Sequence, residues 1–194
     1  MAKDYTQKPL TAMRRSDRTV TDETWIRRFL HQAPIGILAT VAEGQPFINT
    51  RSFVYDETAN CLYMHGAMEG RTLANISQND RVCFSVVEMG RLIAADVAEK
   101  FSVEYAGVVI FGRASLVEEE SEKNRALQLL LDKYAPHLKV GEDYRPPDER
   151  EVRRTAILCI HIEQWSGKKK EVAVDCPGAY WYPDEGILES TKKK

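Results

Sequence analysis

The sequence predicts an α+β domain built mainly from antiparallel β-strands. Its 194 residues are 43% hydrophobic and 29% charged, which is typical of one globular domain. Its short apolar segments are separated by turns of a few residues, whereas parallel strands need longer crossovers. A closed sheet would also remove exposed strand edges. We therefore expect one domain over residues 1–194, with a polar N-terminal arm at 1–18 and an irregular C-terminal tail at 173–194.

The first half of the chain predicts one helix followed by three strands. In the segment TVTDETWIRRFLHQA, Thr21 is a suitable N-cap and Pro34 ends the helix. One face of this helix is apolar. The strands are expected at 35–41, 46–55 and 61–65, with turns at 42–45 and 56–60.

The second half predicts two more helices and three more strands. Gly107 and Gly112 interrupt the longest strand and favour a bend or a bulge there. Residues 137–150, which contain a double proline, are expected to form a loop, and the chain is expected to be irregular from Gly167 onward. The expected elements are helix 71–78, strand 82–88, an unassigned stretch at 89–101, strand 102–117, helix 118–135 and strand 155–165.

Charge and cysteine content exclude several classes of protein. The 27 basic and 29 acidic residues give a formal charge of −2, which favours neither nucleic acid nor an anionic membrane as a partner. There is no apolar run of about 20 residues and no signal sequence, so we expect a cytoplasmic protein. No C-x-x-C or H-x-x-x-H pair is present, and no metal site is expected.

The segment LYMHGAMEGRT is the strongest candidate for a binding site. A strand ends at His65, small residues follow, and Arg71 begins a helix. Unpaired backbone N–H groups at a helix start, together with a guanidinium, suit a phosphate group. Gly66, Ala67 and Gly70 would let a ligand approach the backbone. The alternative is an ordinary glycine loop with a solvated arginine, and His65 is either a ligand contact or a strand-end residue bonded to backbone.

Three other patterns are open to two interpretations. The polar residues within PFINTRSFVY could contact a planar ring, or they could form the solvent face of a strand. The segment EQWSGKKK offers a tryptophan and positive charge, or a core tryptophan before a basic turn. Cys159, His161 and Glu163 share one strand face, and an ordinary surface is favoured over a metal site.

Taken in order, these segments resemble the pyridoxamine 5′-phosphate oxidase-like, FMN-binding split-barrel superfamily, and most closely its 5-nitroimidazole-resistance branch. The resemblance covers about residues 12–172 and rests on MRRSDRTVTDE, GILATVAEGQPFINTRSFVYD, LYMHGAMEGRTLANISQNDRVCFSV, YAGVVIFGRASLVEEESEKNRALQLLLDKY and TAILCIHIEQWSGKKKE. It implies a six-stranded antiparallel split β-barrel with flanking helices. It also implies a homodimer with FMN between the subunits, with FAD or a deazaflavin as less favoured cofactors.

The resemblance also assigns roles to individual residues. The FMN ring would lie against Asn49, Thr50, Arg51 and Ser52, and the strand end Met64, His65, Gly66 and Ala67 would line the ring or ribityl side. Gly70 and Arg71 would hold the phosphate, while Trp165, Gly167 and Lys168 would approach from the partner subunit. The chain departs from the family pattern at Asn49–Thr50, at Ala106–Gly107, where a serine is usual, and at Arg71, where lysine is common.

The expected function is that of an FMN-dependent oxidoreductase acting on small aromatic acceptors, including nitroaromatic compounds, with NAD(P)H as a candidate donor. In this reading His65 is the catalytic residue and donates a hydrogen bond or a proton. One alternative is a flavin- or haem-binding carrier or sensor without turnover, with His65 or His161 as a candidate haem ligand. Another is a pyridoxamine-phosphate oxidase, although the basic residues typical of its substrate site are not evident.

Overall fold

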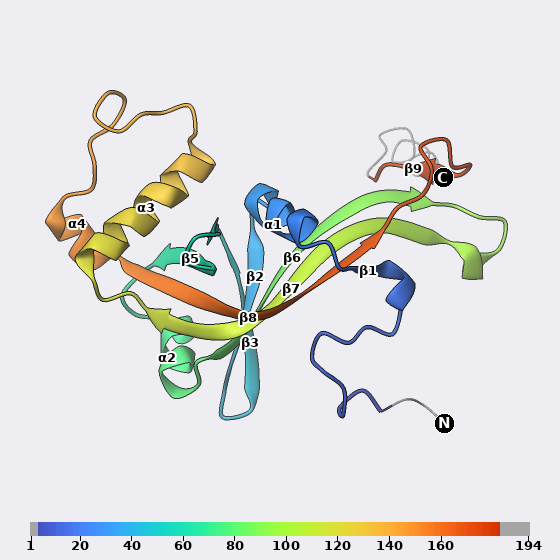
Figure 1. Cartoon of the computed structure of the whole chain (residues 1–194), viewed down its shortest axis with the longest axis horizontal. Helices are drawn as coiled ribbons and strands as arrows, with labels where there is room; N and C mark the ends of the chain where they lie inside the picture. Colours follow the sequence, from blue (N-terminus) through green and yellow to red (C-terminus); the bar gives the residue numbers. More distant parts are fainter. Residues whose placement is uncertain (1–3, 183–194) are drawn as a thin grey trace, which may run out of the picture.

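The fold is a single antiparallel sheet with helices packed against it (Figure 1). The computed structural model describes residues 4–182. Strands follow the order β3-β2-β6-β7-β8-β5-β4, while β1 pairs with β8 and β9 pairs with β6. The strands are β1 (Thr19–Val20), β2 (Gly36–Ala42), β3 (Gln45–Arg51), β4 (Val54–Asp56), β5 (Cys61–Gly66), β6 (Arg81–Ile93), β7 (Ser102–Leu116), β8 (Ala156–Lys170) and β9 (Ala179–Tyr180).

The predicted α+β class, dominated by antiparallel strands, is confirmed. The sheet has nine strands where the resemblance implies six, because β1, β4 and β9 are pairings of only two or three residues. Within residues 4–182 no ladder joins β3 to β4, so the strand path stays open between its two ends. The covalent chain itself links these ends through Ser52 and Phe53.

Helix α1 (Glu23–Gln32) matches the first predicted helix, and its apolar face buries Ile26 and Leu30 against the sheet. Its N-cap is Asp22 rather than the expected Thr21. The Asp22 carboxylate accepts a hydrogen bond from the Thr24 backbone N–H at 2.9 Å, and so satisfies one of the free donors of the first turn.

The strand expected at 46–55 is broken into β3 and β4. The Tyr134 hydroxyl explains the break, because it takes over the backbone groups of Phe53. It accepts from the Phe53 N–H at 2.9 Å and lies 3.0 Å from the Phe53 carbonyl oxygen. A tyrosine 81 residues away in sequence therefore ends β3 at Arg51.

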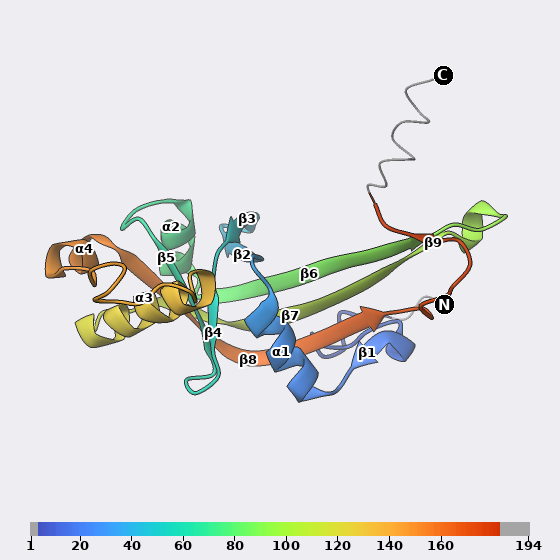
Figure 2. The same ribbon diagram turned by 90° about the horizontal axis from the view of Figure 1, so that it is seen from above.

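The second half of the sheet is longer than expected. The unassigned stretch is strand as far as Ile93, followed by the short helix η2 (Ala98–Lys100). The expectation of an irregular chain from Gly167 was wrong, because β8 continues to Lys170 and pairs with β7 along this end, while Gly167 and Lys168 also pair with β1 on the other side. The predicted bulge lies at Gly112, where the register between β7 and β8 shifts. Together β6, β7 and β8 form a long curved arm (Figure 2).

Three further helices lie at the other end of the molecule (Figure 1). Helices α2 (Arg71–Gln78) and α3 (Glu120–Tyr134) fall where they were predicted. Helix α4 (Glu149–Arg154) lies in the expected loop, and its start is a capping box in which Asp148 and Glu151 exchange hydrogen bonds. A short helix η1 (Ser16–Arg18) precedes β1 in the N-terminal arm.

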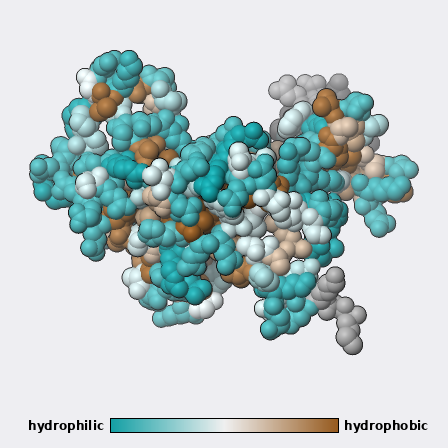
Figure 3. Space-filling model, viewed as in Figure 1, coloured by the Kyte–Doolittle hydropathy of each residue, from teal (hydrophilic) through white to brown (hydrophobic). Residues whose placement is uncertain are grey.

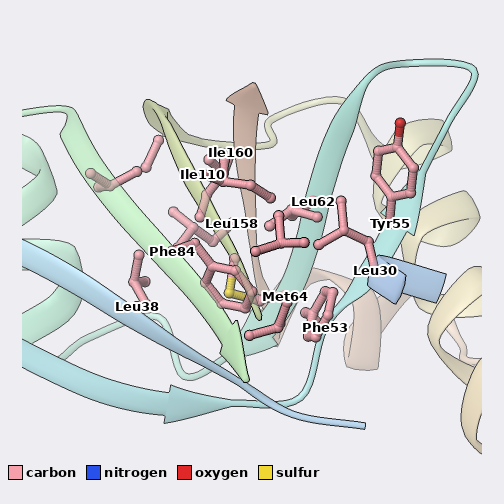
Figure 4. Close-up of a cluster of buried hydrophobic side chains, with 14 of the residues drawn as sticks. Leu30, Leu38, Phe53, Tyr55, Leu62, Met64, Phe84, Ile110, Leu158 and Ile160 are labelled. Atoms are coloured by element: carbon pink, nitrogen blue, oxygen red, sulfur yellow. The ribbon is translucent and has the colours of Figure 1, made fainter. Parts of the chain in front are cut away.

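Two apolar clusters fill the interior. The larger lies between the sheet and α1, and in it Phe53 and Phe84 meet edge to face at 4.9 Å (Figure 4). The smaller one lies under α3 and includes Cys61, Cys159 and Leu130. The face shown in Figure 3 is mostly hydrophilic with scattered apolar areas. No helix among residues 4–182 has the length and apolar character to span a membrane. Residues 1–3 of the predicted arm and 183–194 of the predicted tail lie outside the described residues.

Candidate functional site

The candidate site lies where the end of β5, the start of α2 and the edge strand β3 come together. Gly66 ends β5, and Gly70 and Arg71 begin α2. Arg51 ends β3, and its guanidinium is so close to Gly66 that an added Cβ there would lie 3.3 Å from Arg51 Nη1. Two segments that the sequence analysis treated separately are therefore parts of one site.

Arg51 is a half-buried cation without a protein counter-ion among residues 4–182. Its Nε is buried and has no hydrogen-bond partner in the described part of the chain. Burial lowers the pKa of Arg51 from its ordinary value, since the charged form is poorly solvated there. A buried donor left unpaired destabilises the fold by about 1–3 kcal/mol, so the position favours an anionic ligand that completes the guanidinium's bonding.

The start of α2 adds free backbone donors. Gly70 occupies the N-cap with a φ of +140°, a conformation that side-chain-bearing residues rarely adopt. No atom lies within 4 Å of where its Cβ would be, so the approach to the helix start is open. Arg71 is the first helical residue and is exposed, with Ala67 nearby in the same exposed loop. This arrangement can hold a phosphate or a carboxylate.

Strand β3 offers both of its faces and one free edge. It pairs only with β2, so its outer backbone groups have no ladder partner among the described strands. The Asn49 amide lies toward α2, 3.5 Å from the Thr72 hydroxyl. Thr50 is exposed and points to the opposite face, as expected for alternating residues. Ser52, half-buried, follows the strand end. The edge can supply donors and acceptors to a flat, polar ring.

His65 and Met64 differ in what they offer a ligand. The His65 side chain is exposed at the end of β5 and makes no hydrogen bond within residues 4–182, which leaves both ring nitrogens available. Met64 is fully buried in the larger core cluster, so only its backbone can approach a bound molecule (Figure 4).

The site lies beside the start of β8, where Ala156 pairs with Gly66, whereas Trp165, Gly167 and Lys168 lie in the second half of this strand. Trp165 packs beneath the Arg27 guanidinium, 4.9 Å from its ring centre. Gly167 is covered by the chain itself, since a Cβ there would lie 3.0 Å from Val20 and 3.1 Å from Ile26. Lys168 extends over the Tyr105 ring. One protomer therefore does not bring these three residues to the site around Arg51.

Sequence reasoning missed a polar support behind the site. The Asn75 side chain donates to the Thr40 hydroxyl at 2.9 Å, and both side chains are buried. This bond fixes α2 against β2. The i, i+3 spacing of Thr72 and Asn75 on one face of a short helix was the available signal.

The trio Cys159, His161 and Glu163 does not form a metal site. Within the described part of the chain no three metal-binding side chains converge. The Cys159 Sγ lies 3.7 Å from His161 Nε2, whereas Glu163 forms an ion pair with Arg113 at 2.9 Å. Cys159 is buried in the smaller apolar cluster under α3, while His161 and Glu163 are exposed, so only these two residues fit the interpretation of an ordinary surface.

Comparison with known proteins defines the family. The sequence profile of the family described as pyridoxamine 5′-phosphate oxidase matches residues 22–169, so this chain belongs to that family. No protein of curated function matched its sequence.

Solved structures share the fold at low sequence identity. The flavocytochrome Anf3 from Azotobacter vinelandii is 23% identical with a TM-score of 0.74, and the match covers 92% of this chain and 78% of that one. The FAD and heme binding protein from Mycobacterium smegmatis is 19% identical with a TM-score of 0.71, covering 89% and 80%. A structure described as a 5-nitroimidazole antibiotic resistance protein from Bacteroides thetaiotaomicron is 21% identical with a TM-score of 0.66, covering 79% and 90%.

Proposed function

We propose that this chain is a flavin-binding oxidoreductase that holds FMN between the two subunits of a homodimer. The observation that carries the proposal is the buried, unpartnered Nε of Arg51 beside Gly66, next to the open start of α2. A terminal phosphate would satisfy the guanidinium and the helix N–H groups together. Arg71 would add a second, more exposed positive charge at the same place.

The remaining surfaces suit the rest of a flavin. The free edge of β3, with Asn49, Thr50 and Ser52, would bind the polar edge of the ring, while Ala67 would border it. When bound, a flavin supplies two-electron redox chemistry that no protein side chain provides. The exposed imidazole of His65 would donate a hydrogen bond or a proton to a substrate on the ring.

A second copy of the chain would complete the site. Gly66 pairs with Ala156 at the start of β8, whereas Trp165 and Lys168 lie in the second half of that strand and do not reach Arg51 within one protomer. An apolar patch on the outer face of β2, β3 and β6 supports a dimer, since Ile48 and Val87 are 65% and 68% exposed. Ile35, Ile37 and Met89 belong to the same patch.

The identity of the cofactor can be read directly. The purified full-length protein is expected to be yellow, and heat should release a molecule with the mass of FMN. FAD would be the other result within this proposal, because structural neighbours from Mycobacterium smegmatis and Mesorhizobium loti are described as FAD-binding. A deazaflavin would be distinguished by its blue-shifted absorption. A colourless protein that fails to bind any of the three would contradict the proposal.

The phosphate assignment is tested with two arginine variants. Arg51→Met and Arg71→Ala should each weaken FMN binding about tenfold or more, because each removes a charged hydrogen bond to phosphate. Riboflavin, which has no phosphate, should bind equally to both variants and to the unmodified chain. Arg150→Ala, an exposed arginine on α4, is the control and should bind FMN normally. Unchanged FMN affinity in both site variants would overturn the assignment.

The acceptor that we propose is a small nitroaromatic compound, reduced two electrons at a time with NAD(P)H as donor. The fold shared with the structure described as a 5-nitroimidazole resistance protein supports this choice. The test is anaerobic NAD(P)H oxidation with and without a 5-nitroimidazole. His65→Ala should lower the rate and His137→Ala should not, since His137 lies in the loop after α3. Tight flavin binding with no NAD(P)H oxidation would instead indicate a carrier or sensor.

Haem binding is a second candidate, favoured by two neighbours that are described as a flavocytochrome and as an FAD and heme binding protein. His65 and His161 are both exposed and would be the candidate ligands. Titration with haem should give a Soret band that His65→Ala or His161→Ala removes. Oxygen consumption with pyridoxine 5′-phosphate would identify a pyridoxamine-phosphate oxidase instead.

A further inference from the structure

A second group of cations gathers around Tyr105, on the arm formed by β6, β7 and β8. Arg18 comes from the N-terminal arm, and its Nη1 donates to the Tyr105 hydroxyl at 3.1 Å. Lys168 comes from β8, and its ammonium lies 5.3 Å from the centre of the same ring. The Lys168 side chain can reach the Tyr105 ring because the residue paired with Lys168 on β7 is Gly107, which has no side chain.

These two cations lack a strong carboxylate partner. Lys168 forms no ion pair among residues 4–182. Arg18 lies 3.9 Å from the Asp17 carboxylate, but that group is already bonded in two places to Arg15, through Nε at 2.8 Å and through Nη2. The adjacent Lys169 is paired with Glu171. The group around Tyr105 therefore carries excess positive charge.

The electrostatics of Tyr105 agree with that excess. Burial alone would raise the pKa of Tyr105, but hydrogen bonding to Arg18 and Lys168 outweighs it and holds the pKa below its ordinary value. The phenol accepts from Arg18, and among the described residues its own O–H has no acceptor. The phenol O–H, the remaining guanidinium N–H groups of Arg18 and the Lys168 ammonium thus surround one ring, and among residues 4–182 none of them has a hydrogen-bond acceptor other than the phenol oxygen.

We propose that Arg18, Tyr105 and Lys168 form a second anion site, which binds the phosphate of a phosphate monoester. The acceptor oxygens of a phosphate match three convergent donors, and a dianion matches two cations. Within one protomer this site is separate from the cradle at the start of α2, and Lys168, which the proposed dimer would bring to the partner's flavin, is the one residue that the two proposals share.

The test measures binding of inorganic phosphate and of 5′-AMP to the full-length protein by calorimetry. Arg18→Gln and Lys168→Gln should each weaken binding about fivefold or more, and Tyr105→Phe should weaken it less. Arg14→Gln is the matched control, because Arg14 is exposed in the same arm. If AMP binds more tightly than phosphate, the ligand is an organic monoester. If AMP and inorganic phosphate bind equally, the site recognises the phosphate group alone.

A second measurement follows the phenol itself. The near-ultraviolet titration of the Tyr105 hydroxyl, taken as the difference from Tyr105→Phe, should move to higher pH when phosphate is present. Phosphate binding that Arg51→Met abolishes and Arg18→Gln leaves unchanged would overturn this inference and support only the flavin cradle. Absence of any binding at millimolar phosphate would also overturn it, without bearing on the flavin.

Discussion

A single hydroxyl decides how the candidate site is built. Tyr134 lies at the end of α3, yet its oxygen is 2.7 Å from the Pro34 carbonyl and 2.9 Å from the Phe53 nitrogen. It holds together Pro34, which follows the C-cap of α1, and the break between β3 and β4. Because Arg51 is the last residue of β3, the position of its guanidinium depends on this contact.

Tyr134→Phe should therefore lower stability and flavin affinity together. The loss leaves the Phe53 backbone groups without their partner, which costs about 1–3 kcal/mol of unfolding free energy. Chemical denaturation and FMN titration of the same preparation would measure both effects. Tyr182→Phe, at a largely exposed position, serves as the control. Equal stability of the two variants would show that the Tyr134 hydroxyl does not stabilise the break between β3 and β4.

The long strands β7 and β8 are shaped by one glycine. A Cβ on Gly112 would lie 2.1 Å from the carbonyl oxygen of His161, which is backbone and cannot rotate away. The register shift of this strand pair lies between Phe111 and Gly112. The bulge thus lets the two strands approach closely while they continue into the arm.

Gly112→Ala is expected to destabilise the protein by about 1–3 kcal/mol, because the added methyl group overpacks the two backbones. Thermal unfolding followed by circular dichroism would measure the effect. Ser115→Ala, an exposed change in the same strand, should leave the melting temperature nearly unchanged. A Gly112→Ala protein as stable as the parent would mean that β8 can shift without penalty.

The segment that follows β8 is held against β6 and β7 by one ion pair, between Arg91 and Glu104. Arg91 binds the Glu104 carboxylate through Nε at 2.8 Å and Nη2 at 2.9 Å, and it also donates to three carbonyl oxygens of residues 172–174. Glu104 accepts a further bond from the Val172 N–H at 2.8 Å. The side-chain hydrogen bond from Arg91, together with these backbone bonds, lowers the pKa of Glu104 to about 2.

Docking of residues 172–174 onto Glu104 should therefore weaken as the pH becomes acidic. Because the pKa of Glu104 is lower when the tail is docked, its contribution is complete above the ordinary pKa of a glutamate. It is lost as the pH falls toward about 2. Hydrogen exchange of residues 172–180 should show constant protection near neutral pH and falling protection in acid. Glu104→Gln should show reduced protection at neutral pH, and a pH-independent tail would contradict this account.

At the scale of the whole molecule, the sheet exposes an apolar face on β2, β3 and β6, and this face is the one that we propose as the dimer interface. The patch formed by Ile35, Ile37, Ile48, Val87 and Met89 lies beside the free edge of β3. In the proposed dimer, burying such a patch against a second copy would stabilise both subunits.

Val87→Glu should convert the proposed dimer to a monomer, because a carboxylate would lose its hydration in the interface. Light scattering coupled to size exclusion would give the mass. Val174→Glu provides the control, since Val174 is 93% exposed in the tail. A monomeric parent protein would refute the dimer, whereas a dimeric Val87→Glu protein would place the interface elsewhere.

Local patterns predicted most of the elements correctly. Helix α2 was predicted with its observed bounds, and α1 and α3 to within a few residues, because their apolar spacing and end residues are local signals. The resemblance to the superfamily was confirmed by the family match. The short helix α4 was missed because its capping box lies within a segment that a double proline marks as a loop.

What the sequence determined by itself is the class of fold, the order of most elements and the segment that we propose as the phosphate cradle. These follow from periodicity, turn residues and helix ends, which are properties of neighbouring residues. Only the tertiary structure decided that Tyr134 splits a strand and that Arg18 and Lys168 meet at the Tyr105 ring. It alone also decided that the Arg51 guanidinium lies beside Gly66 with its buried Nε unpaired among residues 4–182. Each of these depends on residues brought together from distant parts of the chain, and local spacing carries no record of such contacts.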